Sequence, residues 1–182
     1  AMAGFAAYMK IDGFNILPVT SFSMAATTFV GQNYGAGNLK RVKKGTWVTL
    51  AMGVLYTLCT GALLLAFQNP IMHLFTSDET LIRISERAII VTMLTFPLVG
   101  AQMASTGFFQ SIGKAKISML LSLSRQLLFF LPALLVLPNF YQTDGVWLAQ
   151  PISDVISFVV AIVLLTKYVK KFKAAQAEGA AV

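Results

Sequence analysis

Four charged side chains lie inside long apolar stretches of this sequence, and they are its first candidates for chemistry. They are Lys10, Asp12, Arg125 and Asp154. A charge within hydrocarbon is costly, so such residues usually face a helix-bundle interior or a wet cavity, where they pair or handle ions and substrates. Each of the four therefore needs either a partner or a polar cavity.

Arg125 and Asp154 are placed so that they can pair. Counted from the same membrane face, Arg125 lies about eight residues deep and Asp154 about twelve, a difference of about 6 Å at 1.5 Å per residue. Their helices are joined by a short loop and are expected to pack antiparallel. We predict an intramembrane ion pair with a structural role; substrate or proton handling is the alternative.

Asp12 and Asn15 are three residues apart and share one helix face, which could line an aqueous cavity. The alternative is that Lys10 snorkels and Asp12 lies near the membrane surface. Phe96 and Met103 could line a greasy pocket, or simply pack or face lipid. Small residues in the same segment predict close approach of a neighbouring helix; they are Gly100, Ala101, Ala104, Ser105 and Gly107.

The elements that must position these residues are membrane-spanning helices. Hydrophobic residues make up 57% of the chain and charged residues 12%, and the mean hydropathy is +0.73. A span needs about 20 predominantly apolar residues, and the runs here are long and do not alternate, which favours helices over a barrel. We predict an all-α, polytopic membrane protein with five spans, over residues 4–30, 46–67, 88–112, 117–138 and 146–166.

The net charge is +7, and the positions of the cations along the chain indicate how the spans are oriented in the membrane. If the spans alternate, ten cations fall on one side, which is the positive-inside pattern; they are Lys40, Arg41, Lys43, Lys44, Lys114, Lys116, Lys167, Lys170, Lys171 and Lys173. The first span then starts outside, and residues 174–182 form a disordered cytoplasmic tail. Clusters of this kind meet anionic lipid headgroups, so we favour membrane lipid over nucleic acid as a partner.

Enzyme and metal chemistry are not indicated. Cys59 and His73 are the single cysteine and the single histidine, and neither has a second potential ligand nearby. No phosphate-binding loop, nucleophile elbow or zinc motif is present. We predict no catalytic residues, no metal site and no bound cofactor.

Four motifs appear in a characteristic order. Residues 30–38 read Val-Gly-Gln-Asn-Tyr-Gly-Ala-Gly-Asn at the end of the first span, and residues 107–114 read Gly-Phe-Phe-Gln-Ser-Ile-Gly-Lys at the end of the third. Ser124-Arg125-Gln126 with Pro132 lies in the fourth span, and residues 145–154 open the fifth. Together these motifs resemble the C-terminal lobe of the multidrug and toxic compound extrusion (MATE) family over nearly the whole chain up to Lys173.

The resemblance implies a twelve-helix transporter with two lobes and a central cleft. The five spans would be family helices eight to twelve, so the N-terminal lobe and the seventh helix would be missing from this chain. The intact protein would export amphipathic, often cationic compounds from the prokaryotic inner membrane by alternating access, coupled to Na⁺ or H⁺. Its partners would be lipid, these substrates and the missing lobe.

The resemblance also assigns roles to residues. Asp12, Asn15, Phe96, Gln102 and Met103 would face the cleft. Gly31, Gln32, Asn33 and Gly35 would belong to a cytoplasmic connector. Residues 94–109 lack the embedded carboxylate that some branches carry, so cation coupling is expected to rest mainly on the first lobe. A related lipid-linked or polysaccharide flippase, and a non-transporting membrane scaffold subunit, remain the alternatives.

Overall fold

The structure is a computed structural model that describes the backbone of residues 2–73 and 79–179. Within these ranges it describes all side chains except those of residues 2–12, 14–15, 80–81, 83–85, 87–88, 141–144 and 172–179.

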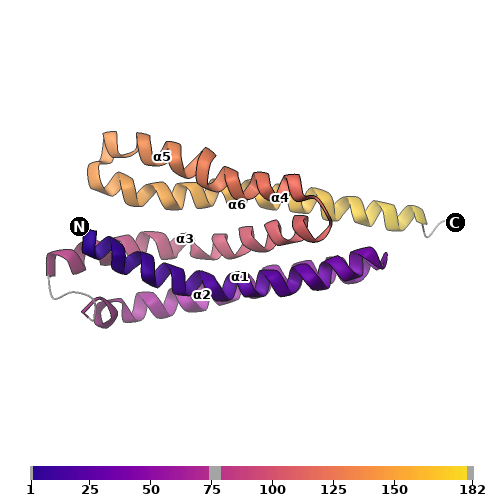
Figure 1. The fold of residues 1–182 in the computed structure, drawn as a ribbon, viewed down its shortest axis with the longest axis horizontal. Coiled ribbons are helices and arrows are strands. Elements are labelled where there is room, and N and C mark those ends of the chain that lie inside the picture. The colour runs from indigo at the N-terminus through magenta and orange to yellow at the C-terminus, as the bar shows by residue number, and fades with distance from the viewer. Residues whose placement is uncertain (1, 74–78, 180–182) are drawn as a thin grey trace.

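The described part is helical throughout and contains no strand. Its segments are α1 (Met2–Gly35), α2 (Leu39–His73), α3 (Glu79–Ser111), α4 (Ala115–Leu123), the π-helix η1 (Ser124–Phe130), α5 (Leu131–Val136) and α6 (Pro138–Gly179). Figure 1 shows α1, α2 and α3 lying side by side on one flank, and α4, α5 and α6 on the other. Because α3 packs against α1, α2, α4 and α6, it is the central helix of the bundle.

The predicted helical membrane fold is confirmed. Among the described residues, four helical stretches are long and apolar enough to cross a membrane: Leu39–His73, Ile89–Ser111, Ala115–Phe140 and Gly145–Lys171. The predicted first span, 4–30, lies on α1, but most of its side chains before Ile16 lie outside the described residues. The helices run past the predicted spans because helix continuity depends on backbone hydrogen bonds, and a helix can project its charged ends into water.

Two sharp turns at one end of the bundle share a single backbone motif. At the end of α1, the N–H of Asn38 bonds to the carbonyl of Asn33 and that of Gly37 bonds to Tyr34. The end of α3 repeats this pattern around Gly113. Both glycines have a left-handed φ, +72° and +73°, which glycine adopts without a side-chain clash. The predicted connector residues Gly31, Gln32, Asn33 and Gly35 thus form the last turns of α1, and residues 36–38 make the turn itself.

The ten cations at residues 40–44, 114–116 and 167–173 belong to segments beside these turns and to the C-terminal half of α6, which lie at one end of the molecule (Figure 1). We call this end the basic end. The sequence pattern predicted disorder for 174–182, but α6 continues to Gly179. Ala, Lys, Gln and Glu are good helix formers, so they can prolong a helix that is already nucleated. Residues 180–182 lie outside the described residues, and disorder of the tail stays a prediction.

The fourth and fifth predicted spans form a hairpin with an irregular first arm. The π-helix η1 lies between α4 and α5 and ends just before Pro132. Proline lacks the backbone N–H that a regular α-helix would use, so the helix is irregular here. A Cβ on Gly145 would lie 2.5 Å from the carbonyl carbon of Leu137. In a straight helix residues eight apart are separated by about 12 Å, so the chain folds back there, and α6 returns along η1 and α5.

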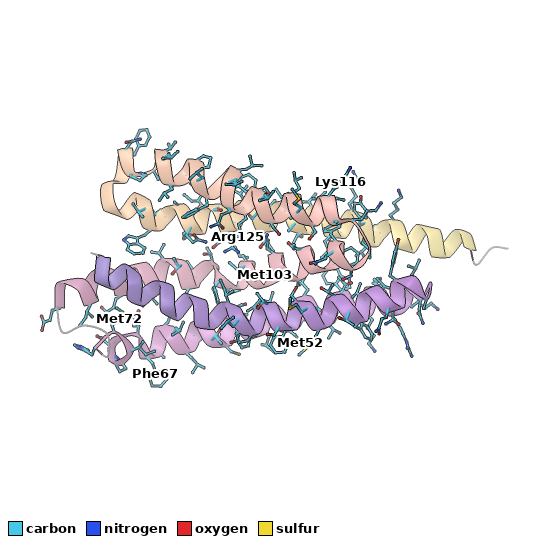
Figure 2. All side chains as sticks on the ribbon, viewed as in Figure 1. Met52, Phe67, Met72, Met103, Lys116 and Arg125 are labelled. Atoms are coloured by element: carbon cyan, nitrogen blue, oxygen red, sulfur yellow. The ribbon has the colours of Figure 1, made fainter. Side chains whose placement is uncertain are left out.

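Two buried apolar clusters hold the bundle together. One, near the basic end, contains Val42, Phe109, Leu121 and Leu165. The other lies toward the opposite end and packs α2 against α3. Figure 2 shows the side chains on the bundle, with Met72 and Phe67 at the end opposite Lys116. Large apolar side chains also cover the outside of the bundle, for example Leu94, which is 78% exposed. Such a surface suits a hydrocarbon environment.

Candidate functional site

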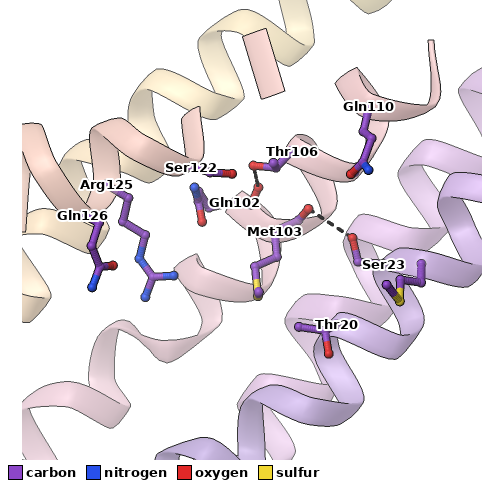
Figure 3. A pocket seen from close by; sticks show the side chains of 11 residues that line it. Thr20, Ser23, Gln102, Met103, Thr106, Gln110, Ser122, Arg125 and Gln126 are labelled. Atoms are coloured by element: carbon purple, nitrogen blue, oxygen red, sulfur yellow. Dashed lines mark hydrogen bonds between the residues drawn. The ribbon is translucent and has the colours of Figure 1, made fainter. Parts of the chain in front are cut away.

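A pocket of about 290 Å³, with polar side chains in a partly apolar lining, opens between α1, α3, α4 and η1. Figure 3 shows side chains from these elements around it. Its lining residues are Thr20, Ser23, Met24, Gln102, Met103, Thr106, Gly107, Gln110, Ser122, Arg125 and Gln126. Most of them carry a hydrogen-bonding group, although the surrounding segments are apolar enough to span a membrane.

Polar groups reach this pocket because three helices each present a polar stripe to it. On α3, Gln102, Thr106 and Gln110 recur every four residues and so share one face. On α1, Thr20 and Ser23 are three residues apart, and Ser122 and Arg125 have the same spacing across α4 and η1. The packing of α1 and α4 against α3 brings these stripes together.

Some polar groups of the lining are already used to hold the helices together. Ser23 Oγ donates a hydrogen bond to the carbonyl of Met103 at 3.3 Å, which joins α1 to α3. Gln102 Nε2 approaches the carbonyl of Leu121 at 3.5 Å and joins α3 to α4. Thr106 Oγ1 donates within α3 to the carbonyl of Gln102 at 3.0 Å (Figure 3).

Other polar groups remain available to a ligand. Within the described part of the chain, the side chains of Gln110, Ser122 and Gln126 form no hydrogen bond, and all three line the pocket. Each amide offers two donors and one acceptor, and the hydroxyl offers both functions. The pocket can therefore bind either kind of polar group on a small molecule.

Among the lining residues that the structure describes, Arg125 alone carries a formal charge. Its Nε donates to Oδ1 of Asp154 at 2.9 Å, so the structure joins the two residues that the sequence predicted as a pair. Asp154 is 4% exposed, and Gln150 Nε2 lies 3.4 Å from the same oxygen. Ser153 Oγ also donates to the Arg125 carbonyl at 2.8 Å. This group of polar contacts fastens η1 to α6, which fits the structural role predicted for the pair.

The structure places the predicted cavity residues in different surroundings. Gln102 and Met103 line the pocket, whereas Phe96 is buried in the apolar cluster between α2 and α3. Phe96 lies nearly two helical turns from Gln102, next to Met93 and Val99, so it contributes to packing. The side chains of Asp12 and Asn15 lie outside the described residues.

Sequence reasoning assigned no cavity role to most of the polar lining, although it named Gln110 and Gln126 within motifs. The residues concerned are Thr20, Ser23, Thr106, Gln110, Ser122 and Gln126. The available signal was their spacing of three or four residues within otherwise apolar runs. A polar stripe on one helix has many explanations, and only the convergence of three stripes identifies a pocket.

The sequence was compared with protein families and with known proteins, and similar transporters were found. The MatE family pattern matches residues 1–136. A probable multidrug resistance protein NorM of Thermotoga maritima is 25% identical over 162 residues, which is 86% of this chain and 34% of that protein. An FAD transporter of Shewanella oneidensis is 22% identical over 178 residues, 98% of this chain and 39% of that protein.

Among solved structures, the MATE multidrug transporter DinF-BH is 34% identical, with a TM-score of 0.83. The similarity covers 90% of this chain and 36% of that one. The chain thus spans a little over a third of the length of these relatives.

Proposed function

Since this chain belongs to the MatE family, we propose that it forms part of a multidrug exporter. The chain would be most of the C-terminal lobe of that exporter, and a second lobe would precede it. The whole protein would export amphipathic, often cationic compounds by alternating access. It would be a cation-coupled antiporter using Na⁺ or H⁺. The family is one of transporters, and the chemistry of the described residues suits binding and release.

The polar pocket is the observation that carries this proposal. A transporter must offer its substrate polar contacts inside the membrane without binding it too tightly to release it. Unbonded amides and a hydroxyl, together with the flexible thioethers of Met24 and Met103, can adapt to varied molecules. The pocket would then be the part of the substrate cleft that this lobe supplies.

A cationic substrate and a coupling ion also need negative charge. No carboxylate is present among the pocket-lining residues that the structure describes. We therefore assign the counter-charge to Asp12, with Asn15 beside it, or to the lobe before Ala1. Exchanging Asp12 for asparagine should weaken export at normal expression, and unchanged export would remove Asp12 from the site.

Transport of an anionic compound is the second candidate. Arg125 places a guanidinium at a pocket whose described lining has no carboxylate, and one relative is named an FAD transporter. This is the chemistry that a flippase for phosphate-linked lipids would also need. Proteoliposomes of the complete gene product separate the two candidates: uptake of ethidium supports the first, and uptake of FAD with no uptake of ethidium supports the second.

Filling the pocket should stop transport without unfolding the protein. We expect Ser122→Trp to reduce export about tenfold, equivalent to about 1.4 kcal/mol of lost binding, because the indole would occupy the space between α3 and η1. Export from an efflux-deficient bacterial strain, normalised to membrane expression, measures this. Leu120→Trp is the matched control, since Leu120 is 59% exposed and does not line the pocket. Equal loss in both variants would contradict a pocket role.

We also propose that the basic end faces the cytoplasm of a prokaryotic cell, with the C-terminus inside. Single cysteines can test this in a background from which Cys59 and any other native cysteine have been removed. Lys116→Cys should resist a membrane-impermeant maleimide in spheroplasts, whereas Asn139→Cys should react. Both residues are exposed, so permeabilised membranes should label both. The reverse pattern would invert the topology.

A further inference from the structure

A second pocket, of about 250 Å³, lies at the basic end between α2 and α6. Lys43 and Trp47 line it from α2, and Thr166, Val169 and Lys170 line it from α6. Lys43 and Trp47 are four residues apart, as are Thr166 and Lys170, so each helix turns one pair toward the other. The pocket is thus formed by two helices that are more than a hundred residues apart in the chain.

The pocket is electropositive. Lys43 and Lys170 are exposed and form no ion pair in the described part of the chain. The sequence contains no Asp or Glu between Gly13 and Ser77 or between Val155 and Ala177, so neither helix carries a counter-charge near them. The indole N–H of Trp47 forms no hydrogen bond with the residues that the structure describes, whereas Thr166 Oγ1 already donates to the carbonyl of Ile162 at 2.8 Å. Two ammonium groups and an indole suit an oxygen-rich anion such as a phosphodiester.

The pocket is also continuous with a lipid-facing surface. Trp47 is 42% exposed, and three turns farther along the same face of α2 Leu58 is 51% exposed. On α6, Val163 and Val159 are exposed one and two turns away from Thr166. An anion bound here would therefore have two apolar helix surfaces leading from it into the membrane. Tryptophan is also typical of the depth at which headgroups meet hydrocarbon.

We propose that the pocket between α2 and α6 binds the headgroup of an anionic phospholipid of the cytoplasmic leaflet. Lys43 and Lys170 hold the phosphate, Trp47 lies against the glycerol region, and Leu58 of α2 with the exposed valines of α6 contacts the acyl chains. A basic pocket between spanning helices on the cytoplasmic side is a favourable lipid site. The inference rests on the proposed topology, in which the basic end is cytoplasmic, but its surface is separate from the transport pocket and does not depend on the substrate.

The test uses the complete gene product in nanodiscs of phosphatidylcholine with increasing phosphatidylglycerol. The readout is the thermal unfolding midpoint. Lys43→Gln/Lys170→Gln should unfold like the wild type in phosphatidylcholine alone but lose more than about half of the stabilisation by phosphatidylglycerol. Lys114→Gln/Lys116→Gln removes the same charge from the basic end outside the pocket and should keep most of it. Lys43→Arg/Lys170→Arg preserves both charges and should retain the stabilisation.

Each other outcome overturns the proposal. Equal losses in the two glutamine variants would mean diffuse attraction to an anionic surface. No loss in either would mean that another part of the protein covers the pocket. Stabilisation of the detergent-solubilised protein by inorganic phosphate or glycerol phosphate, abolished by Lys43→Gln/Lys170→Gln, would identify a free phosphate compound as the ligand.

Discussion

Replacing Arg125 with methionine is expected to lower the folded yield of the complete gene product severalfold, and to do so more than it changes the range of compounds exported. Asp154 is 4% exposed and accepts the Arg125 Nε–H bond at 2.9 Å. Removing one partner of a buried ion pair leaves the other charge uncompensated, at a cost of about 3–5 kcal/mol. The measurement is the monodisperse fraction in detergent, compared with Lys116→Met, which removes an exposed cation from the same span.

A double variant distinguishes a structural role from a substrate contact. Arg125→Met/Asp154→Leu removes both charges, and replacing a whole buried ion pair with apolar side chains is often neutral or stabilising. We expect most of the folded yield to return. Recovery of export with it would confirm that the pair is structural. Recovered yield without export would make Arg125 a substrate contact, as transport of an anionic compound requires.

Normal yield for the single variant Arg125→Met would contradict the structural interpretation directly. It would mean that Asp154 is neutralised without the guanidinium, by a proton or by another part of the protein. In that case the carboxyl group would become a candidate for proton coupling.

The helices were predictable because the bilayer imposes a simple rule on the sequence. Long uncharged runs must be helices, and the cations at their ends must lie on one side. The Arg125–Asp154 contact followed from counting depth along two neighbouring helices. The helix ends could not be predicted from this rule. Hydropathy shows where a chain leaves the hydrocarbon layer, but α2 and α6 continue as helices well beyond that point.

The pocket was only half predictable, because it depends on how the helices rotate about their axes. Gln102 and Met103 turned out to line it, whereas Phe96 on the same helix faces α2. Hydropathy along α3 cannot distinguish these faces, since α3 contacts neighbours on several sides. The π-helix η1, which changes the rotation of the residues after Ser124, also had no clear signal apart from Pro132.

Gly100→Ala is expected to be among the most destabilising single-methyl changes in this chain. A Cβ on Gly100 would lie 2.7 Å from the Gly53 carbonyl oxygen and 2.9 Å from the Thr57 hydroxyl oxygen. The first of these is backbone, and Thr57 is fully buried. Helices α2 and α3 would have to separate, which for overpacking costs about 1–3 kcal/mol.

The same substitution at two other glycines gives an ordered series. A Cβ on Gly53 would meet the Gly100 carbonyl oxygen at 3.2 Å, a milder contact, and a Cβ on Gly35 would meet nothing within 4 Å. Gly35→Ala should be neutral or stabilising by up to about 1 kcal/mol, because alanine favours the helix. Thermal unfolding midpoints in detergent should fall in the order Gly35→Ala, Gly53→Ala, Gly100→Ala.

The order separates packing from helix propensity, because propensity alone favours alanine at all three positions. If Gly100→Ala matched Gly35→Ala, α2 and α3 could not approach each other as closely as the structure places them. The apolar cluster around Phe96 would then also be packed differently, since it is built on the same contact between these two helices. The small residues in the third predicted span would lose their explanation as a site of close helix contact.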